Sequence, residues 1–172
     1  MRQIDYRTNV LYLEIPETFE QFIMATPLQV SRQHVWRPTQ LAPIERIPLF
    51  GHSVPAGFPS PADDYVDDWL DLNQLLVHNK SATFFLRVKG DSMIGAGIHD
   101  GDIIVVDRSV EPADGAVVVA VIDGALTIKR LVFGNGPPEL HSENPKYAPI
   151  RFKEGQELTI WGVVTSSVHL VR

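Results

Sequence analysis

The second half of the chain consists of short strand-like runs that are separated by tight-turn sequences. Runs rich in β-branched and other apolar residues occupy positions 83–89, 102–107, 116–122, 126–133 and 158–170. They are separated by Asp100-Gly101, Asp114-Gly115, Asp123-Gly124 and the Gly/Pro-rich segment 134–138. Runs of this kind, punctuated by turn dipeptides, are typical of antiparallel strands joined by tight turns. We therefore predict a mainly β domain that contains a curled antiparallel sheet.

Prolines mark a different organisation upstream. Six of the 13 prolines fall within residues 38–61. Because proline has a fixed φ and no N–H, this segment is expected to form neither a helix nor a central strand. Further upstream, Pro16 and Pro27 bracket a short helix predicted over residues 17–25. The N-terminal part is thus predicted to be an extended, partly helical arm.

A run of aspartates follows the proline-rich segment. Ser60 and Pro61 have the order of an N-cap and first helical residue, so a short acidic helix is predicted from residue 60 onward. Its carboxylates are Asp63, Asp64, Asp67, Asp68 and Asp71. Such spacing can hold Mg²⁺ or serve acid–base chemistry, but it is more often a solvated helix face. We favour the solvated face and predict no metal site and no cofactor.

The composition excludes several classes of function. The 172 residues include no cysteine, which rules out thiol catalysis, disulfides, zinc fingers and iron–sulfur clusters. A net charge of -6 argues against a surface that binds DNA by neutralising phosphates, and residues 1–45 show no helix-turn-helix pattern. No run approaches the roughly 20 apolar residues of a membrane span, and the N-terminus lacks a signal-peptide pattern. We expect a cytoplasmic protein without membrane association or direct sequence-specific DNA binding.

The histidines form no recognisable motif. Each of the six lies at least 18 residues from the next, so none has the spacing of a helical metal site. We expect them to be surface or structural residues. A Ser-His-Asp triad stays open, because triad members come from distant positions in a sequence.

Two segments are candidates for catalytic chemistry. In Gly90-Asp91-Ser92-Met93, glycine permits the tight turn that a nucleophilic serine needs in order to expose its hydroxyl, although an ordinary turn has the same composition. In the run 126–133, strand alternation places Lys129 on one face with Leu131, and the adjacent arginine on the other.

Lys129 therefore has two possible roles. A lysine in such a run can protect an edge strand. Alternatively, desolvation lowers its pKa from the usual ~10.4 and leaves a neutral amine that can take a proton from a serine.

Seven short blocks decide between these interpretations. They are PLF at 48–50, AGFPSPADDYV at 56–66, DLNQLL at 71–76, SATFF at 81–85, GDSM at 90–93, DGDIIVVD at 100–107 and TIKRL at 127–131. In this order they resemble the LexA/UmuD family of self-cleaving serine peptidases, most closely the UmuD branch of SOS mutagenesis proteins. The resemblance covers residues 44–172. It implies a LexA/UmuD-type curled antiparallel β peptidase domain.

The resemblance also implies the site residues. Ser92 would be the nucleophile and Lys129 the general base, and Ala56–Gly57 would be the scissile bond. The backbone N–H groups of Ser92 and Met93 are the candidates for holding the oxyanion. The prolines near Ala56 agree with this, because they keep the segment extended, as a peptide in a protease cleft must be.

Finally, the resemblance implies an organisation and partners. Residues 1–43 would be an extension of unknown role, 44–79 a proline-rich cleavable arm with the acidic helix, and 80–172 the peptidase domain. A RecA filament on single-stranded DNA would stimulate cleavage. The product 57–172 would form a homodimer and join an error-prone Y-family polymerase subunit of the UmuC type. The alternatives are a LexA-like self-cleaving transcriptional repressor and a polymerase accessory protein that does not cleave itself.

Overall fold

The computed structural model describes residues 3–5, 10–12, 35–36, 47–50, 66–152 and 158–171. The chain divides into two compact units. Residues 39–78 form the smaller unit, and residues 1–38 together with 79–172 form the larger one. None of the helices in the described ranges has the length and apolar character that crossing a bilayer requires.

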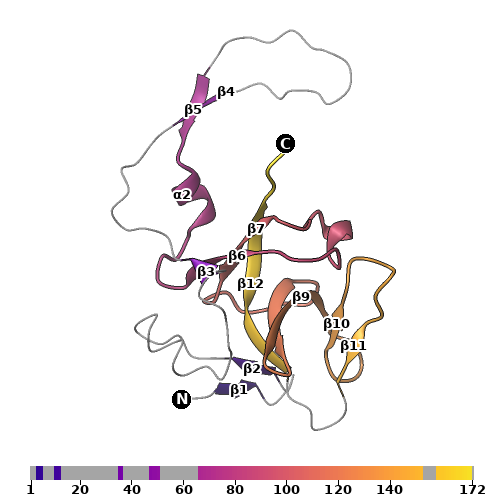
Figure 1. Cartoon of the computed structure of the whole chain (residues 1–172). Helices are drawn as coiled ribbons and strands as arrows, with labels where there is room; N and C mark the ends of the chain where they lie inside the picture. Colours follow the sequence, from indigo (N-terminus) through magenta and orange to yellow (C-terminus); the bar gives the residue numbers. More distant parts are fainter. Residues whose placement is uncertain are drawn as a thin grey trace. The chain divides into compact units, whose positions relative to one another are not determined.

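The larger unit is built on one ten-stranded sheet. Its strands are β1 (Gln3–Asp5), β2 (Val10–Tyr12), β3 (Val35–Trp36), β6 (Thr83–Arg87), β7 (Ile103–Asp107), β8 (Val117–Ile122), β9 (Ala125–Val132), β10 (Glu139–His141), β11 (Ile150–Arg151) and β12 (Leu158–Val168). The order is β11-β10-β9-β8-β12-β7-β6-β3, and β2 joins β12 beside β1. Figure 1 shows β12 as the long yellow strand, with β10 and β11 beyond β9. Only the β2–β12 pairing is parallel among the described strands.

The prediction of a mainly β, antiparallel domain is confirmed. Each of the five predicted runs corresponds to one strand, namely β6, β7, β8, β9 and β12. The predicted turn at Asp123-Gly124 joins β8 to β9, and both residues have positive φ, +49° and +78°. Two such residues form the hairpin turn whose twist matches that of the flanking strands.

The N-terminal residues contribute more to the sheet than the sequence pattern indicates. Strand β2 pairs with the beginning of β12, and β3 pairs with β6. These strands have only two or three residues, which is too short for a hydrophobic period to be visible. The helix predicted over residues 17–25 lies outside the described residues.

The predicted acidic helix is wrong over residues 66–70. In the smaller unit this segment is a strand, β5 (Val66–Leu70), which pairs with β4 (Ile47–Phe50). Pairing with β4 satisfies its backbone groups, and this long-range partner is invisible to a local pattern. A helix, α2 (Leu72–Leu76), begins only after Asp71, whose carboxylate accepts a hydrogen bond from the Asn73 N–H at 2.8 Å. The carboxylate of Asp71 is therefore a helix cap rather than part of an acidic face.

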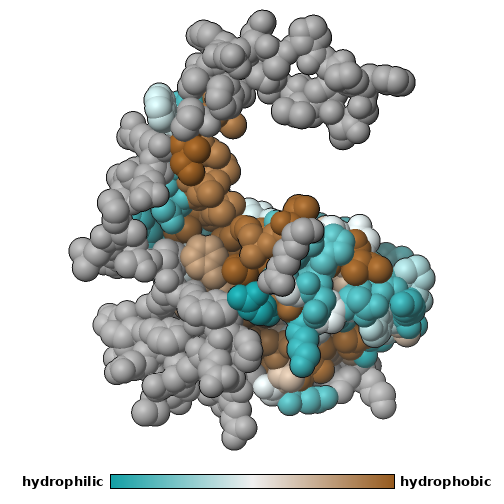
Figure 2. Space-filling view, turned by 45° about the horizontal axis from the view of Figure 1, so that its top comes forward, coloured by the Kyte–Doolittle hydropathy of each residue, from teal (hydrophilic) through white to brown (hydrophobic). Residues whose placement is uncertain are grey.

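The smaller unit also leaves apolar side chains exposed. Figure 2 shows brown, apolar surface over this part of the chain. The exposed residues are Ile47, Leu49, Trp69, Leu72 and Leu75.

Two clusters of buried side chains form the core of the larger unit. The Trp161 cluster comprises Phe84, Leu86, Val88, Met93, Ile98, Ile104, Val106, Val119 and Trp161. The Leu131 cluster comprises Val118, Ala120, Leu131, Leu140, Leu158, Ile160 and Val163. The adjacent residues Val118 and Val119 belong to different clusters, because successive side chains of a strand point to opposite faces. The middle of the sheet is therefore buried on both sides.

The sheet curls through irregularities in β12. The register with β8 shifts between Ile160 and Gly162, and the register with β7 shifts between Val164 and Ser166. Bulges of this kind bend a strand and increase its twist. As a result, β9 packs side chains against the Trp161 cluster, to which β6 contributes, and both strands line one cavity, although β8, β12 and β7 separate them in the sheet.

Candidate active site

Ser92 lies in a tight turn that follows β6 and precedes a short 3-10 helix, η1 (Ile94–Ala96). Gly90 enters the turn with a φ of +96°, a conformation that favours glycine. The N–H of Gly90 donates to Oδ1 of Asp100 at 2.6 Å. Met93 is buried in the Trp161 cluster, whereas Ser92 is half-buried. The turn is thus anchored on one side of the serine and leaves the hydroxyl accessible.

The amine of Lys129 lies next to this serine. Its Nζ is 2.9 Å from Oγ of Ser92 and donates to the carbonyl oxygen of Ile128 at 2.8 Å. The side chain extends from β9, directly across from Val118, and the residue is only 8% exposed. Burial lowers the pKa of Lys129 below its ordinary value. Within the described part of the chain, no carboxylate forms an ion pair with Lys129 to oppose this effect.

These contacts suit a neutral amine. A neutral amine has hydrogens to donate, as to the Ile128 carbonyl, and a lone pair that can accept the hydrogen of a hydroxyl. An ammonium has donors only and could not take a proton from Ser92. The interpretation of Lys129 as a charge that guards an edge strand is wrong, because β9 is paired with β8 on one side and β10 on the other.

The neighbouring cation has a different environment. Arg130 is half-buried, its Nε donates to the carboxylate of Glu143, and its guanidinium donates to the carbonyl oxygen of Gly115 at 2.6 Å. Strand alternation thus separates a paired, charged arginine from a buried lysine without an acidic partner among the described residues.

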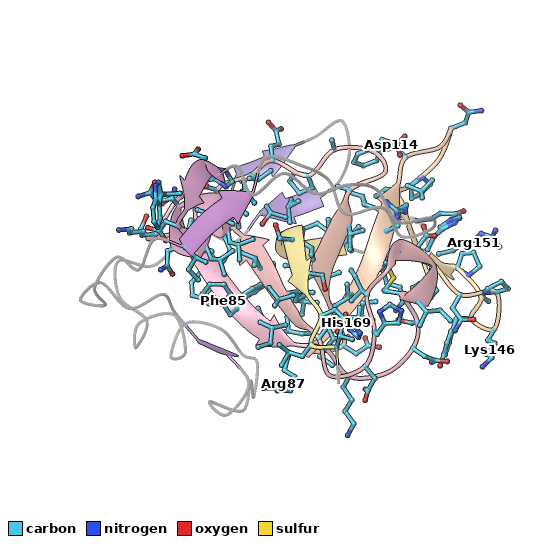
Figure 3. The ribbon with its side chains drawn as sticks, turned by 90° about the horizontal axis from the view of Figure 1, so that it is seen from above. Phe85, Arg87, Asp114, Lys146, Arg151 and His169 are labelled. Atoms are coloured by element: carbon cyan, nitrogen blue, oxygen red, sulfur yellow. The ribbon has the colours of Figure 1, made fainter. Side chains whose placement is uncertain are left out.

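The segment after β10 holds the serine turn in place. Asn144 is almost fully buried, and its amide donates to the carbonyl oxygen of Asp91 at 2.9 Å and to Oδ2 of the same residue at 3.2 Å. The Tyr147 hydroxyl donates to Oδ1 of Asp91, which lowers the pKa of the Asp91 carboxyl and raises that of the phenol. Lys146 adds an exposed ion pair with Asp91 at 3.7 Å and extends to solvent in Figure 3. Asp91, the residue before Ser92, is therefore fixed through both its main chain and its side chain.

A second contact from the same segment reaches the other side of the turn. The N–H of Gly95 donates to the carbonyl oxygen of Glu143 at 2.7 Å. A Cβ at position 95 would lie 2.6 Å from that oxygen, closer than real Cβ contacts. Sequence analysis did not identify Glu143, Asn144 or Tyr147. The available signal was the Asn144-Pro145 dipeptide, which predicts a turn but not what the turn contacts.

Among the predicted site residues, the structure brings Ser92, Met93 and Lys129 together. The backbone N–H groups of Ser92 and Met93 donate no hydrogen bond to any other residue in the described ranges. Ala56 and Gly57 lie outside the described residues. No histidine in the described ranges forms a hydrogen bond with Ser92, so the geometry gives no support to a Ser-His-Asp triad.

The comparison with protein families agrees with this geometry. The family described as Peptidase S24-like matches residues 48–165, which include Ser92 and Lys129. This chain belongs to the peptidase S24-like family. The predicted resemblance to LexA/UmuD proteins is thereby confirmed.

Individual relatives cover most of this S24-like chain. Protein ImpA of Salmonella typhimurium is 44% identical over 126 residues, which is 73% of this chain and 85% of that protein. Protein SamA of Salmonella typhimurium strain LT2 is 46% identical over 125 residues, 73% of this chain and 86% of that protein. LexA repressor 2 of Pseudomonas putida is 37% identical over 142 residues, 83% of this chain and 69% of that protein.

A cleft of about 200 Å³ opens beside the serine of this S24-like chain. One wall comes from the end of β6 and the residues after it, and the other from β9. Its lining residues are Leu86, Arg87, Val88, Lys89, Gly90, Ser92, Met93, Val119, Leu126, Thr127 and Ile128. Because most of these side chains are apolar, the cleft is suited to an extended peptide with small or apolar side chains.

Proposed function

We propose that this chain is a self-cleaving serine peptidase that cuts its own Ala56–Gly57 bond with a Ser92–Lys129 dyad. The observation that carries the proposal is the 2.9 Å distance between Lys129 Nζ and Ser92 Oγ in a buried setting that lowers the pKa of the amine. A nucleophilic hydroxyl needs an adjacent base, and a desolvated lysine is one of the groups that can serve.

The reaction proceeds in two stages. Ser92 Oγ attacks the carbonyl carbon of Ala56 while its proton passes to Lys129 Nζ. The tetrahedral intermediate then collapses, the C–N bond breaks, and Lys129 returns the proton to the amino group of Gly57. Water attacks the resulting ester with Lys129 again as base, which frees Ser92 and leaves a carboxylate on Ala56. The N–H groups of Ser92 and Met93 are the proposed donors to the oxyanion.

The substrate is part of the same molecule. Tethering supplies a high effective concentration of the scissile segment, so the reaction does not need tight binding in the cleft. Pro55 and Pro59 favour an extended backbone around the bond. The removal of residues 1–56 leaves 57–172 as the product.

We assign this activity to the bacterial DNA-damage response. In this assignment a RecA filament on single-stranded DNA stimulates cleavage, and the cytoplasmic product forms a homodimer that joins an error-prone Y-family polymerase subunit. Membership of the S24-like family, the resemblance of the ordered blocks to the UmuD branch and the identity to Protein ImpA and Protein SamA support it.

Intact-mass spectrometry of the purified full chain tests the chemistry. At alkaline pH we expect fragments 1–56 and 57–172 to accumulate, and to be absent in Ser92→Ala and Lys129→Ala. Gly57→Val is expected to block cutting with the fold retained, because a β-branched side chain crowds the attacked carbonyl. Cleavage that persists in Ser92→Ala in the absence of a contaminating protease would overturn the dyad. Lack of cleavage in the parent chain, even with activated RecA, would favour the non-cleaving accessory protein.

One observation favours a second candidate. The identity to LexA repressor 2 extends over 142 residues, 83% of this chain. A LexA-like repressor would bind a specific operator before cleavage and release it afterwards. An electrophoretic mobility shift with DNA from the promoter of its own gene distinguishes the two functions, since we expect no sequence-specific complex.

A further inference from the structure

Two histidines that are far apart in sequence meet at one buried aspartate. Asp102 lies just before β7, His99 three residues earlier, and His169 just after β12. Nδ1 of His169 is 2.6 Å from Oδ1 of Asp102, and Nδ1 of His99 is 3.6 Å from Oδ2. The imidazole rings are 5.1 Å apart between centroids. One ligand atom from each of the three residues lies within 4.8 Å of the other two.

The exposure of the three groups differs in a way that suits a bound ion. The Asp102 side chain is 2% exposed, whereas those of His99 and His169 are 49% and 51% exposed. The aspartate and His169 line an open depression of about 340 Å³, which Arg87 and Asp100 also border. Figure 3 labels His169 and Arg87 on this side of the larger unit. The depression therefore reaches Asp102 from the His169 side of the cluster.

Further contacts orient the carboxylate of Asp102. Its Oδ2 accepts a hydrogen bond from the His99 N–H at 2.8 Å and lies 3.4 Å from the Ser167 hydroxyl. Outer hydrogen bonds of this kind orient the carboxylate ligands of metal ions. Asp100 and Arg87 at the rim add one negative and one positive formal charge beside the buried carboxylate.

We propose that His99, Asp102 and His169 bind one Zn²⁺ ion. Two imidazole nitrogens and a carboxylate oxygen are ordinary zinc ligands, and with a water they complete a tetrahedral set. Zinc–ligand bonds of about 2.0–2.1 Å place ligand atoms about 3.4 Å apart, so the observed separations of 2.6–4.8 Å have to change by up to about 1.4 Å when the ion binds. Zinc takes the place of the hydrogen bond between Nδ1 of His169 and Oδ1 of Asp102, and the carboxylate keeps its hydrogen bond from the backbone N–H of His99.

The ion would join the neighbouring ends of two paired strands. β12 and β7 pair in antiparallel register up to Val168 and Ile103. His169 follows the first of these residues, and Asp102 precedes the second. Bound zinc thus clamps the end of β12 to the loop that leads from the serine turn into β7. The site lies outside the Ser92 cleft and shares no lining residue with it other than Arg87.

Isothermal titration calorimetry with ZnCl₂ tests the proposal on full-length Ser92→Ala protein without an affinity tag. We expect one ion per chain at this site and at least tenfold weaker binding in both His99→Gln and His169→Gln. At a zinc concentration 100 times Kd, the Tm should rise by about 5–10 °C in the parent and much less in these variants. Glutamine can still donate to Asp102, so the hydrogen-bonded structure is retained.

His141→Gln is the matched control. His141 also contacts a carboxylate, that of Glu139 at 2.8 Å, but has no third ligand among the described residues. Zinc affinity should be unchanged in this variant. If zinc does not bind, or if it binds equally well to the parent, His99→Gln and His169→Gln, the cluster is only a hydrogen-bonded anchor and the proposal is overturned.

Discussion

Nζ of Lys129 lies 2.9 Å from Oγ of Ser92, although 37 positions separate the two residues in the chain. The contact depends on two independent features, the glycine-containing turn that presents the serine and the burial of the lysine side chain on β9. A buried amine without an acidic partner among the described residues is costly to protonate. Burial of Lys129 therefore destabilises the folded state when the amine is protonated, and it also supplies a neutral amine that can act as a base.

The pH dependence of cleavage should follow the protonation of Lys129. Since burial lowers its pKa, the self-cleavage rate is expected to rise with pH and to level off below the ordinary lysine value of 10.5. Lys129→Arg keeps a long cationic side chain but has no accessible neutral form, so it should cut at less than 1% of the parent rate at every pH. Fragment yield against time between pH 6 and pH 11 measures the cleavage rates of the parent and of Lys129→Arg. A flat profile in the parent would argue against a lysine base.

Lys129→Met should separate catalysis from stability. The variant removes the base and is expected not to cleave, and it also removes the cost of burying an amine. In the folded protein the pKa of Lys129 is lowered, so between that pKa and 10.5 the unfolded chain binds more protons and the stability of the parent rises with pH. With Ser92→Ala as the common background, the stability advantage of Lys129→Met should therefore shrink as pH increases. Urea unfolding at pH 7 and pH 10 measures the difference, and an advantage that grows with pH would contradict it.

Asn144 should act as a positioning residue for the serine turn. Asn144→Ala removes the hydrogen bond to the part-buried carbonyl of Asp91, which should cost about 0.5–1.5 kcal/mol of stability and slow cleavage tenfold or more. Because the amine of Lys129 is untouched, the midpoint of the pH–rate profile should stay in place. Asn135→Ala, at an exposed position, is the control and should change neither quantity. A shifted midpoint in Asn144→Ala would show that its role is not positional.

Gly95→Ala tests the close approach of the Glu143 carbonyl. The added methyl would lie 2.6 Å from that oxygen, so one of the two segments has to move, at a cost of about 1–3 kcal/mol. Thermal unfolding should show a Tm lower by about 3–10 °C, and cleavage should slow because the serine turn shifts. In Gly134→Ala the new Cβ meets no atom within 4 Å, and this control should unfold like the parent. Equal Tm values for the two variants would mean that the contact is easily relaxed.

The sequence carried most of the information on the larger unit. The five main strands and the Asp123-Gly124 hairpin follow from local composition and period, because these are properties of neighbouring residues. Ser92 and Lys129 were recognisable as candidates, since a serine in a glycine turn and a cation in an apolar strand are local anomalies. The resemblance to the LexA/UmuD family then assigned Ser92 and Lys129 to one site, which their spacing in the sequence alone did not indicate.

Tertiary structure decided what depends on distant partners. Pairing with β4 makes residues 66–70 a strand despite helix-like signals, and only the neighbours of β9 show that Lys129 is buried rather than at an edge. Asn144 supports the serine turn through Asp91, which lies 53 positions away in the sequence. His169 meets Asp102 and His99, which lie 67 and 70 positions away. Local patterns record which residues can form a strand or a turn. Burial and proximity, which set the pKa of the lysine and assemble the sites, arise only when the sheet curls.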